Sequence, residues 1–186
     1  MLPDHILTVL EDWRSEFESD SIIQQRDGTR GHTNNKHVEW IFHEIAGQLG
    51  LEAISFGSCR MVFALSPRRV LKVGYSRFGM RSNQLEAEAA HDLPRRLRAT
   101  VYDVASDGLW LVQERASEQH IDMRRSEARQ LRLALERAFG DYINDFHSGN
   151  VGRRRDGSLI LLDLEFLNRR VRPYDSAELR RYLNYA

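Results

Sequence analysis

The chain has 186 residues, 41% of them hydrophobic, which is enough to build a packed core in one domain or in two small lobes. Lysine plus arginine and aspartate plus glutamate number 27 each, so no global charge draws the chain to nucleic acid or to an anionic membrane. A single cysteine, Cys59, excludes an internal disulfide, and no window approaches the roughly 20 apolar residues of a membrane span. We expect a soluble, cytoplasmic protein without a signal peptide.

Apolar periodicity predicts two helices in the first fifty residues. The first helix covers residues 3–18, and the polar stretch at residues 24–35 is expected to form a loop. The second helix stops at Gly50. Its apolar face is made by Val38, Ile41, Phe42, Ile45 and Leu49.

The period changes after Gly50, where short apolar runs separated by turn residues predict an antiparallel meander. These runs are residues 53–56, 61–65 and 69–73. Ser82 or Asn83 can cap a helix that follows them and ends near His91. Residues 101–104 and 109–113 flank a Ser-Asp-Gly turn and predict a hairpin.

The remaining residues predict a mostly helical part that holds one polar hairpin. A helix covers residues 125–139, and a second, shorter one covers residues 176–183. Between them, Asp156-Gly157 turns residues 151–153 against residues 159–162.

This order of elements predicts an α+β fold with two lobes. We expect an N-terminal helical extension at residues 1–50, a sheet-containing first lobe at residues 51–114 and a short second lobe at residues 115–186. The cleft between the lobes is expected near Glu114.

Asp145, Asn150 and Asp163 form the strongest functional pattern in the sequence. Asn150 follows Asp145 by five residues, and Asp163 comes thirteen residues after Asn150, at the end of an apolar strand. The first aspartate can orient an attacking hydroxyl, while the amide and the second carboxylate offer the oxygen ligands that Mg²⁺ prefers. The alternative, a solvated loop rich in turn residues, does not explain an apolar hairpin that ends in a carboxylate.

Lys72 lies at the centre of an apolar strand and is the candidate phosphate-binding cation. Only Lys36 and Lys72 are lysines in a chain whose other 25 basic residues are arginines. A compact ammonium can sit as a point charge beside a phosphate in a narrow cleft, where the broad guanidinium does not fit. The alternative is a strand lysine that extends along a solvent-facing surface.

Lys72 needs a carboxylate partner, and the helix after it offers Glu86 and Glu88. Glu86 shares a helix face with Ala89, Ala90 and Leu93, so it is expected to point inward. Glu88 groups with polar residues and is expected to be solvated.

Two backbone segments are candidates for nucleotide contacts. Gly57-Ser58 joins two predicted strands, and its amides can cradle a phosphate, although a glycine between strands is also an ordinary turn. Main-chain groups of Glu114 and Ala116, at the expected lobe junction, can hydrogen-bond an adenine edge.

His147 and Arg153-Arg154-Arg155 are given structural interpretations. We expect His147 to brace its loop by hydrogen bonding, and the arginines to form a solvated turn, with a docking point as the alternative. The sequence has neither a histidine pair at helix-face spacing around a glutamate nor Gly-x-Ser-x-Gly, so zinc-protease and serine-hydrolase chemistry lack support.

At these residues the chain resembles the protein-kinase-like superfamily, from about Gly57 to Glu165. Arg69-Val70-Leu71-Lys72-Val73-Gly74 and Asp145-Phe146-His147-Ser148-Gly149-Asn150 look most like the small serine/threonine protein kinases of short-tailed coliphages. The resemblance implies a minimal bilobal fold, with an antiparallel-sheet N-lobe and a truncated helical C-lobe. It also implies ATP and Mg²⁺ as cofactors.

The resemblance assigns a role to each matching residue. Lys72 would bind phosphates with Glu86 as its helix partner, Asp145 would be the catalytic aspartate, and Asn150 and Asp163 would be the metal ligands. The chain departs from the family in three places. Its phosphate loop has one glycine, Ile143-Asn144 replaces the usual His-Arg, and Asp163-Leu164-Glu165 replaces the usual Asp-Phe-Gly.

The first functional hypothesis is therefore an ATP- and Mg²⁺-dependent serine/threonine protein kinase that can phosphorylate itself. The second is a catalytically inactive kinase-like module that binds a nucleotide or a protein. The third is a small-molecule phosphotransferase, similar to the aminoglycoside and choline enzymes. It would need an acidic substrate pocket, for which the nearby candidates are Glu165, Asp175 and Glu178.

The expected partner is a protein substrate, either a host protein or the chain itself, acting in the host cytoplasm if the chain is encoded by a phage. A second copy of the chain is a candidate for completing the substrate surface, which gives a homodimer. Specific nucleic-acid and membrane partners are not expected.

Overall fold

The computed structural model describes residues 2–19, 35–139 and 146–164. The chain divides into two compact units, Met1–Gln84 with Val101–Arg115, and Leu85–Thr100 with Ala116–Ala186. The described elements are α1 (Asp4–Asp12), α2 (Arg14–Glu18), α4 (Asn35–Leu49), β1 (Glu52–Phe56), β2 (Arg60–Ser66), β3 (Arg69–Gly74), α5 (Arg77–Asp92), β4 (Val101–Val104), β5 (Trp110–Glu114), α6 (Ser126–Phe139), the 3-10 helix η2 (Ser148–Asn150), β6 (Val151–Arg153) and β7 (Leu159–Leu161). None of these helices is long and apolar enough to cross a membrane.

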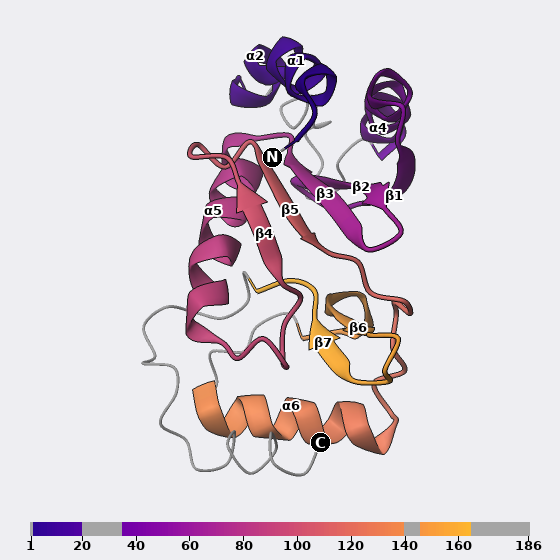
Figure 1. Ribbon diagram of the computed structural model, residues 1–186, viewed down its shortest axis with the longest axis vertical. Coiled ribbons are helices and arrows are strands. Elements are labelled where there is room, and N and C mark those ends of the chain that lie inside the picture. The colour runs from indigo at the N-terminus through magenta and orange to yellow at the C-terminus, as the bar shows by residue number, and fades with distance from the viewer. Residues whose placement is uncertain (1, 20–34, 140–145, 165–186) are drawn as a thin grey trace, which may run out of the picture. The chain divides into compact units, whose positions relative to one another are not determined.

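A five-stranded antiparallel sheet forms the centre of the first unit, in the order β1-β2-β3-β5-β4 (Figure 1). The predicted meander and the predicted β4–β5 hairpin are both confirmed. The pairing of β5 with β3 was not predicted, because the two strands are separated in the sequence by α5 and β4. This pairing makes β3, which carries Lys72, the central strand of the sheet. The α+β class is therefore confirmed.

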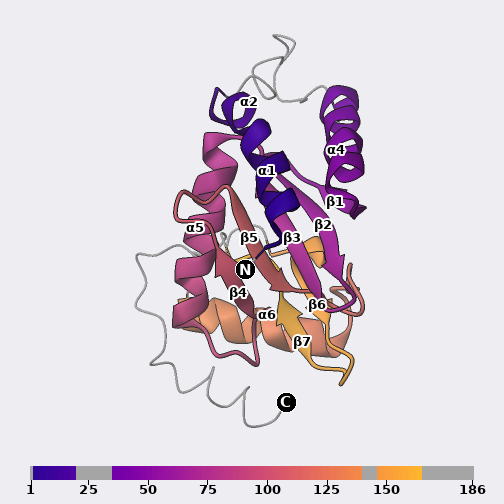
Figure 2. The ribbon, with the colours of Figure 1, turned by 45° about the horizontal axis from the view of Figure 1, so that its top comes forward.

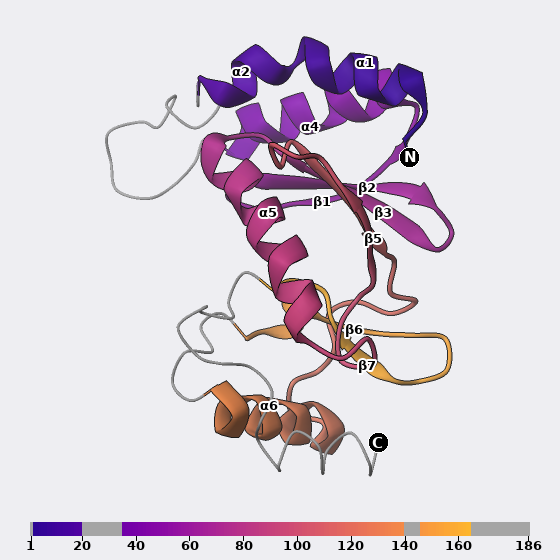
Figure 3. The same cartoon turned by 60° about the vertical axis from the view of Figure 1, so that its left-hand side comes forward.

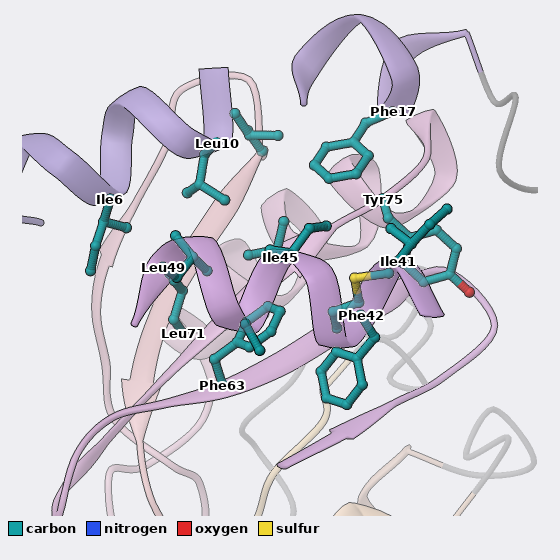
Figure 4. Packing of buried hydrophobic residues seen from close by; sticks show 14 of the residues in the cluster. Ile6, Leu10, Phe17, Ile41, Phe42, Ile45, Leu49, Phe63, Leu71 and Tyr75 are labelled. Atoms are coloured by element: carbon teal, nitrogen blue, oxygen red, sulfur yellow. The ribbon is translucent and has the colours of Figure 1, made fainter. Parts of the chain in front are cut away.

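The N-terminal helices cover one face of this sheet and belong to its core (Figures 2 and 3). Side chains from α1, α2 and α4 pack against those of β2 and β3, as Figure 4 shows. The labelled members of the cluster are Ile6, Leu10, Phe17, Ile41, Phe42, Ile45, Leu49, Phe63, Leu71 and Tyr75. Residues 2–19 and 35–50 thus supply the hydrophobic cover that one face of the sheet requires.

Two helix boundaries in this region involve identifiable hydrogen bonds. The predicted first helix is interrupted at Trp13, whose indole Nε1 donates to Gln48 Oε1 of α4 at 2.9 Å. Helix α4 ends as predicted at Gly50, which has a φ of 65°. The Gly50 N–H donates to Gly47 O and the Leu51 N–H donates to Ala46 O, which satisfies two of the last four carbonyls of the helix.

The predicted cap of α5 was wrong, because the helix begins at Arg77 rather than after Ser82 or Asn83. Ser76 is the cap, since its Oγ accepts the Gly79 N–H at 3.0 Å. Ser82 instead donates its hydroxyl to Phe78 O, one turn earlier in the helix. Asn83 donates from Nδ2 to Gly108 O at 2.9 Å and so ties α5 to the β4–β5 turn.

The second unit contains the β6–β7 hairpin and α6 (Figure 1). The hairpin turns at Gly157, whose φ of 90° requires a glycine, and this matches the predicted Asp-Gly turn. In α6, Leu131 and Leu135 are buried as predicted. The predicted loop at residues 24–35 and helix at residues 176–183 lie wholly or almost wholly outside the described residues.

The three arginines of the hairpin do not form a simple solvated turn, so that prediction was wrong for two of them. Arg153 donates to the carboxylates of Glu118 and Glu127 and to Gly157 O. Arg154 donates to the carbonyl oxygens of Arg95, Arg96 and Arg98. Only Arg155 is exposed as expected. The first two arginines therefore fasten the hairpin to the rest of the second unit.

Candidate functional site

Asn150 and Asp163 flank the open end of the β6–β7 hairpin. Asn150 ends η2 and leads directly into β6, while Asp163 follows two residues after the end of β7. The Leu162 N–H donates to Asn150 O at 2.8 Å, which extends the ladder by one step beyond the two strands. The hairpin thus brings these two predicted metal ligands to neighbouring backbone positions.

His147 braces the turn before Asn150, as predicted. Its Nδ1 accepts the Gly149 N–H at 3.0 Å, and its carbonyl oxygen accepts the Asn150 N–H at the same distance. A Cβ on Gly149 would lie 2.8 Å from His147 Cε1, so the brace also requires the glycine.

The donor chemistry at this end of the hairpin fits a magnesium ion. An amide oxygen and a carboxylate oxygen are hard ligands of the kind that Mg²⁺ takes, together with water and phosphate oxygens. Among the residues that the structure describes, no group of three or more His, Cys, Asp or Glu side chains could hold a metal by itself. The predicted catalytic Asp145 lies outside the described residues, as do Glu165, Asp175 and Glu178.

Lys72 is buried within the first unit, with 6% of its surface exposed. Its neighbours across the sheet are Val62 of β2 and Leu111 of β5. Leu71 and Val73 point to the opposite face and belong to the core under the N-terminal helices. The alternative of a lysine on a solvent-facing surface is therefore wrong. A buried ammonium requires compensating polar groups, which is the environment expected of a ligand-binding lysine.

Glu86 and Glu88 differ as the helix-face argument predicted. Glu86 has no exposed surface, whereas Glu88 is exposed. Buried carboxylates are rare unless they are paired, so the burial of Glu86 marks it as a group with a specific partner. Its assignment to Lys72 stays a prediction.

The Gly57-Ser58 loop between β1 and β2 is exposed and tightly closed. The Gly57 N–H donates to Arg60 O at 2.8 Å. A Cβ on Gly57 would have no atom within 4 Å, and its φ is not positive, so neither packing nor backbone conformation requires a glycine there. Sequence reasoning missed Tyr75, whose hydroxyl donates to Gly57 O at 2.6 Å. No local pattern pointed to it, because the contact joins residues 18 positions apart.

Glu114 and Ala116 fall in different units and are treated separately. Glu114 ends β5, where it pairs with Arg69 of β3. The side chain of Ala116 is buried against Ala99 and Ile160 in the second unit. Packing therefore explains why a small residue stands at Ala116, and contacts from these main-chain groups to an adenine stay a prediction.

Charge pairs hold the elements around the hairpin. The hydrogen bonds from Arg153 lower the pKa of Glu127, against a smaller effect of burial, and the same contact raises the pKa of Arg153. Both groups stay ionised at neutral pH, which keeps the first turn of α6 fastened to β6.

Comparison with solved structures gives distant likenesses alone. No protein-family model and no curated protein matches the chain. Among solved structures, a MAP kinase from Leishmania major aligns with a TM-score of 0.39 and 13% sequence identity. The alignment covers 71% of this chain and 52% of that kinase, so the chain spans about half of the kinase's length.

Proposed function

We propose that the chain is an ATP- and Mg²⁺-dependent phosphotransferase, and that its acceptor is a serine or threonine hydroxyl of a protein, the chain itself included. The observation that carries the proposal is the hairpin end, where the Leu162–Asn150 hydrogen bond sets Asn150 and Asp163 at neighbouring positions. The burial of Lys72 on the central strand and of Glu86 on α5 adds the cation and the carboxylate that phosphate binding needs.

Each residue has a defined part in this proposal. Lys72 holds phosphate oxygens, and Glu86 holds the Lys72 ammonium in place. Asp145 orients the attacking hydroxyl and takes its proton. Asn150 and Asp163 would hold magnesium, which, when bound, offsets the negative charge that builds up on the transferred phosphate. Main-chain groups of Gly57-Ser58 and of Glu114 and Ala116 would contact the nucleotide.

The test is phosphate transfer from γ-labelled ATP with Mg²⁺, in the wild type and in Asp145→Asn and Asp163→Ala variants. The matched control is Asp156→Asn, which alters an exposed aspartate at the far end of the same hairpin and retains an acceptor for the Ser158 N–H. The proposal is supported if the wild type and Asp156→Asn transfer label to the chain or to an added protein, and Asp145→Asn and Asp163→Ala do not.

Two other outcomes would overturn it. No transfer with ATP-dependent thermal stabilisation intact would favour a nucleotide-binding module without catalysis. Transfer to small cationic acceptors and to no protein would favour a small-molecule phosphotransferase.

A further inference from the structure

Tyr75 is a buried tyrosine whose single polar atom reaches the exposed Gly57-Ser58 loop. The residue follows β3 directly and has 0% of its surface exposed. Figure 4 shows its ring in the core cluster near Phe17 and Ile41, with the phenol oxygen at the edge of the cluster. A buried phenol needs a hydrogen-bond partner, and this one donates to Gly57 O at 2.6 Å.

The backbone of Tyr75 holds the other end of the same loop. Its N–H donates to Cys59 O at 3.1 Å, so Tyr75 binds the carbonyl oxygens on both sides of Ser58. The first turn of α5 closes on the same place, because a Cβ on Gly79 would lie 2.0 Å from Cys59 O. Ser58 itself is exposed between the two anchored residues.

These contacts determine which groups the loop can offer to a ligand. A carbonyl oxygen repels a phosphate oxygen, whereas an amide N–H attracts it. Tyr75 turns the carbonyls of Gly57 and Cys59 toward the protein interior, away from the loop surface. Tyr75 also lies three residues after Lys72, on the continuation of the same strand, so the loop and the lysine are held in one rigid frame.

We propose that Tyr75 is a positioning residue for nucleotide binding, which fixes the Gly57–Cys59 loop in the shape that receives the phosphates of the donor. This proposal rests on the proposed function. It explains how a loop with a single glycine can be shaped for phosphate. The hydrogen bonds from Tyr75 to Gly57 O and Cys59 O fix the loop backbone, a part that additional glycines would otherwise play.

The experiment compares Tyr75→Phe with Tyr102→Phe, which removes the same atom from an exposed tyrosine. Tyr102 is 47% exposed, and its ring lies under the Arg69 guanidinium, a contact that phenylalanine retains. We expect Tyr75→Phe to raise KM for ATP about five- to tenfold, as the loss of one hydrogen bond implies, with a smaller change in kcat. Hydrogen exchange at residues 57–60 should be faster than in the wild type, and Tyr102→Phe should change neither quantity.

If Tyr75→Phe is active and its KM for ATP equals that of Tyr102→Phe, the positioning role of Tyr75 is overturned. The proposed function then stays intact. Absence of transfer and of ATP binding in the wild type overturns both. If Tyr75→Phe does not fold, the wild type still decides the matter, since a saturating non-hydrolysable ATP analogue should slow exchange at residues 57–60. Unchanged exchange there would overturn the proposal.

Discussion

The Leu162 N–H donates to the Asn150 carbonyl oxygen at 2.8 Å, one step beyond the paired strands of the β6–β7 hairpin. This bond fixes the backbone on which Asn150 and the adjoining Asp163 stand. The hairpin is fastened in turn by Arg153 and Arg154, which donate to side chains and carbonyls outside it. Main-chain geometry therefore holds the backbone at the two candidate metal ligands.

Replacing Asn150 with alanine should weaken Mg²⁺ binding without unfolding the chain. The hydrogen bond from the Leu162 N–H is accepted by the Asn150 main-chain carbonyl, which alanine retains. We expect the half-saturating Mg²⁺ concentration for phosphate transfer to rise about tenfold or more. Asn150→Asp keeps an oxygen ligand and should restore most of the affinity. A magnesium titration of initial rates in the three proteins measures this, and identical titrations would remove Asn150 from the metal site.

Replacing Lys72 with methionine should lower phosphate transfer about 10²-fold or more, because a buried cation at the phosphates is lost. The chain offers a matched control in its other lysine, since Lys36 on α4 is exposed. Lys36→Met should leave both activity and melting temperature unchanged. Equal activity in the two variants would exclude Lys72 from catalysis.

The two glutamates of α5 should differ sharply on substitution. Glu86→Gln removes a fully buried charge and should destabilise the fold by about 3 kcal/mol, whereas exposed Glu88→Gln should change stability by less than about 0.5 kcal/mol. If Glu86 is the partner of Lys72, the double variant Glu86→Gln/Lys72→Met should lose less stability than the sum of the losses in the two single variants. Urea denaturation of the wild type, Glu86→Gln, Lys72→Met and the double variant measures this coupling. Strictly additive losses would argue against a Lys72–Glu86 pair.

Gly57 in the Gly57–Cys59 loop and Gly79, which lies against Cys59, should respond in opposite ways to replacement by alanine. Gly79→Ala should destabilise the fold by roughly 2 kcal/mol or more, because the new Cβ would lie within 2.0 Å of Cys59 O and 3.0 Å of Gly74 Cα. Gly57→Ala should be neutral for stability, since its Cβ meets no atom within 4 Å. A higher KM for ATP in Gly57→Ala at unchanged melting temperature would then report on nucleotide approach alone.

The ion pair between Arg14 of α2 and Asp107 in the β4–β5 turn should make part of the stability of the first unit depend on pH. Partial burial opposes ionisation of Asp107, but hydrogen bonds from the Leu109 N–H and from Arg14 outweigh it and lower its pKa below the ordinary 3.8. A lowered folded-state pKa stabilises the fold above the unfolded-state value, and this contribution is lost as the pH falls through the folded-state pKa.

Asp107→Asn should therefore cost about 0.5 kcal/mol near neutral pH, a modest value because the pair is partly exposed, and should cost almost nothing below the folded-state pKa. Asp12→Asn, at an exposed position that ends α1, serves as control. Denaturant unfolding from neutral to acidic pH measures the difference. A cost that does not change with pH would show that the pair contributes nothing through its charge.

The local elements followed from the sequence because their signals are local. The α4 stripe ends at Gly50, and Asp156-Gly157 turns the second hairpin, since a positive φ is needed at Gly50 and Gly157. Helical spacing was enough to separate buried Glu86 from exposed Glu88. The start of α5 was misplaced because Ser76, Ser82 and Asn83 are all suitable caps by residue type. The structure identifies Ser76 by the Gly79 N–H that its Oγ accepts, a contact that residue type alone does not reveal.

By itself, the sequence determined the α+β class, most of the helix and strand positions and the pattern of Lys72, Asn150 and Asp163, because periodicity, turn residues and spacing act over a few neighbouring residues. Only the tertiary structure decided that β3 is the central strand, that the N-terminal helices are part of the core and that Tyr75 anchors the Gly57–Cys59 loop. These features join residues far apart in the chain, and their energies come from burial and from hydrogen bonds that exist only once distant segments meet.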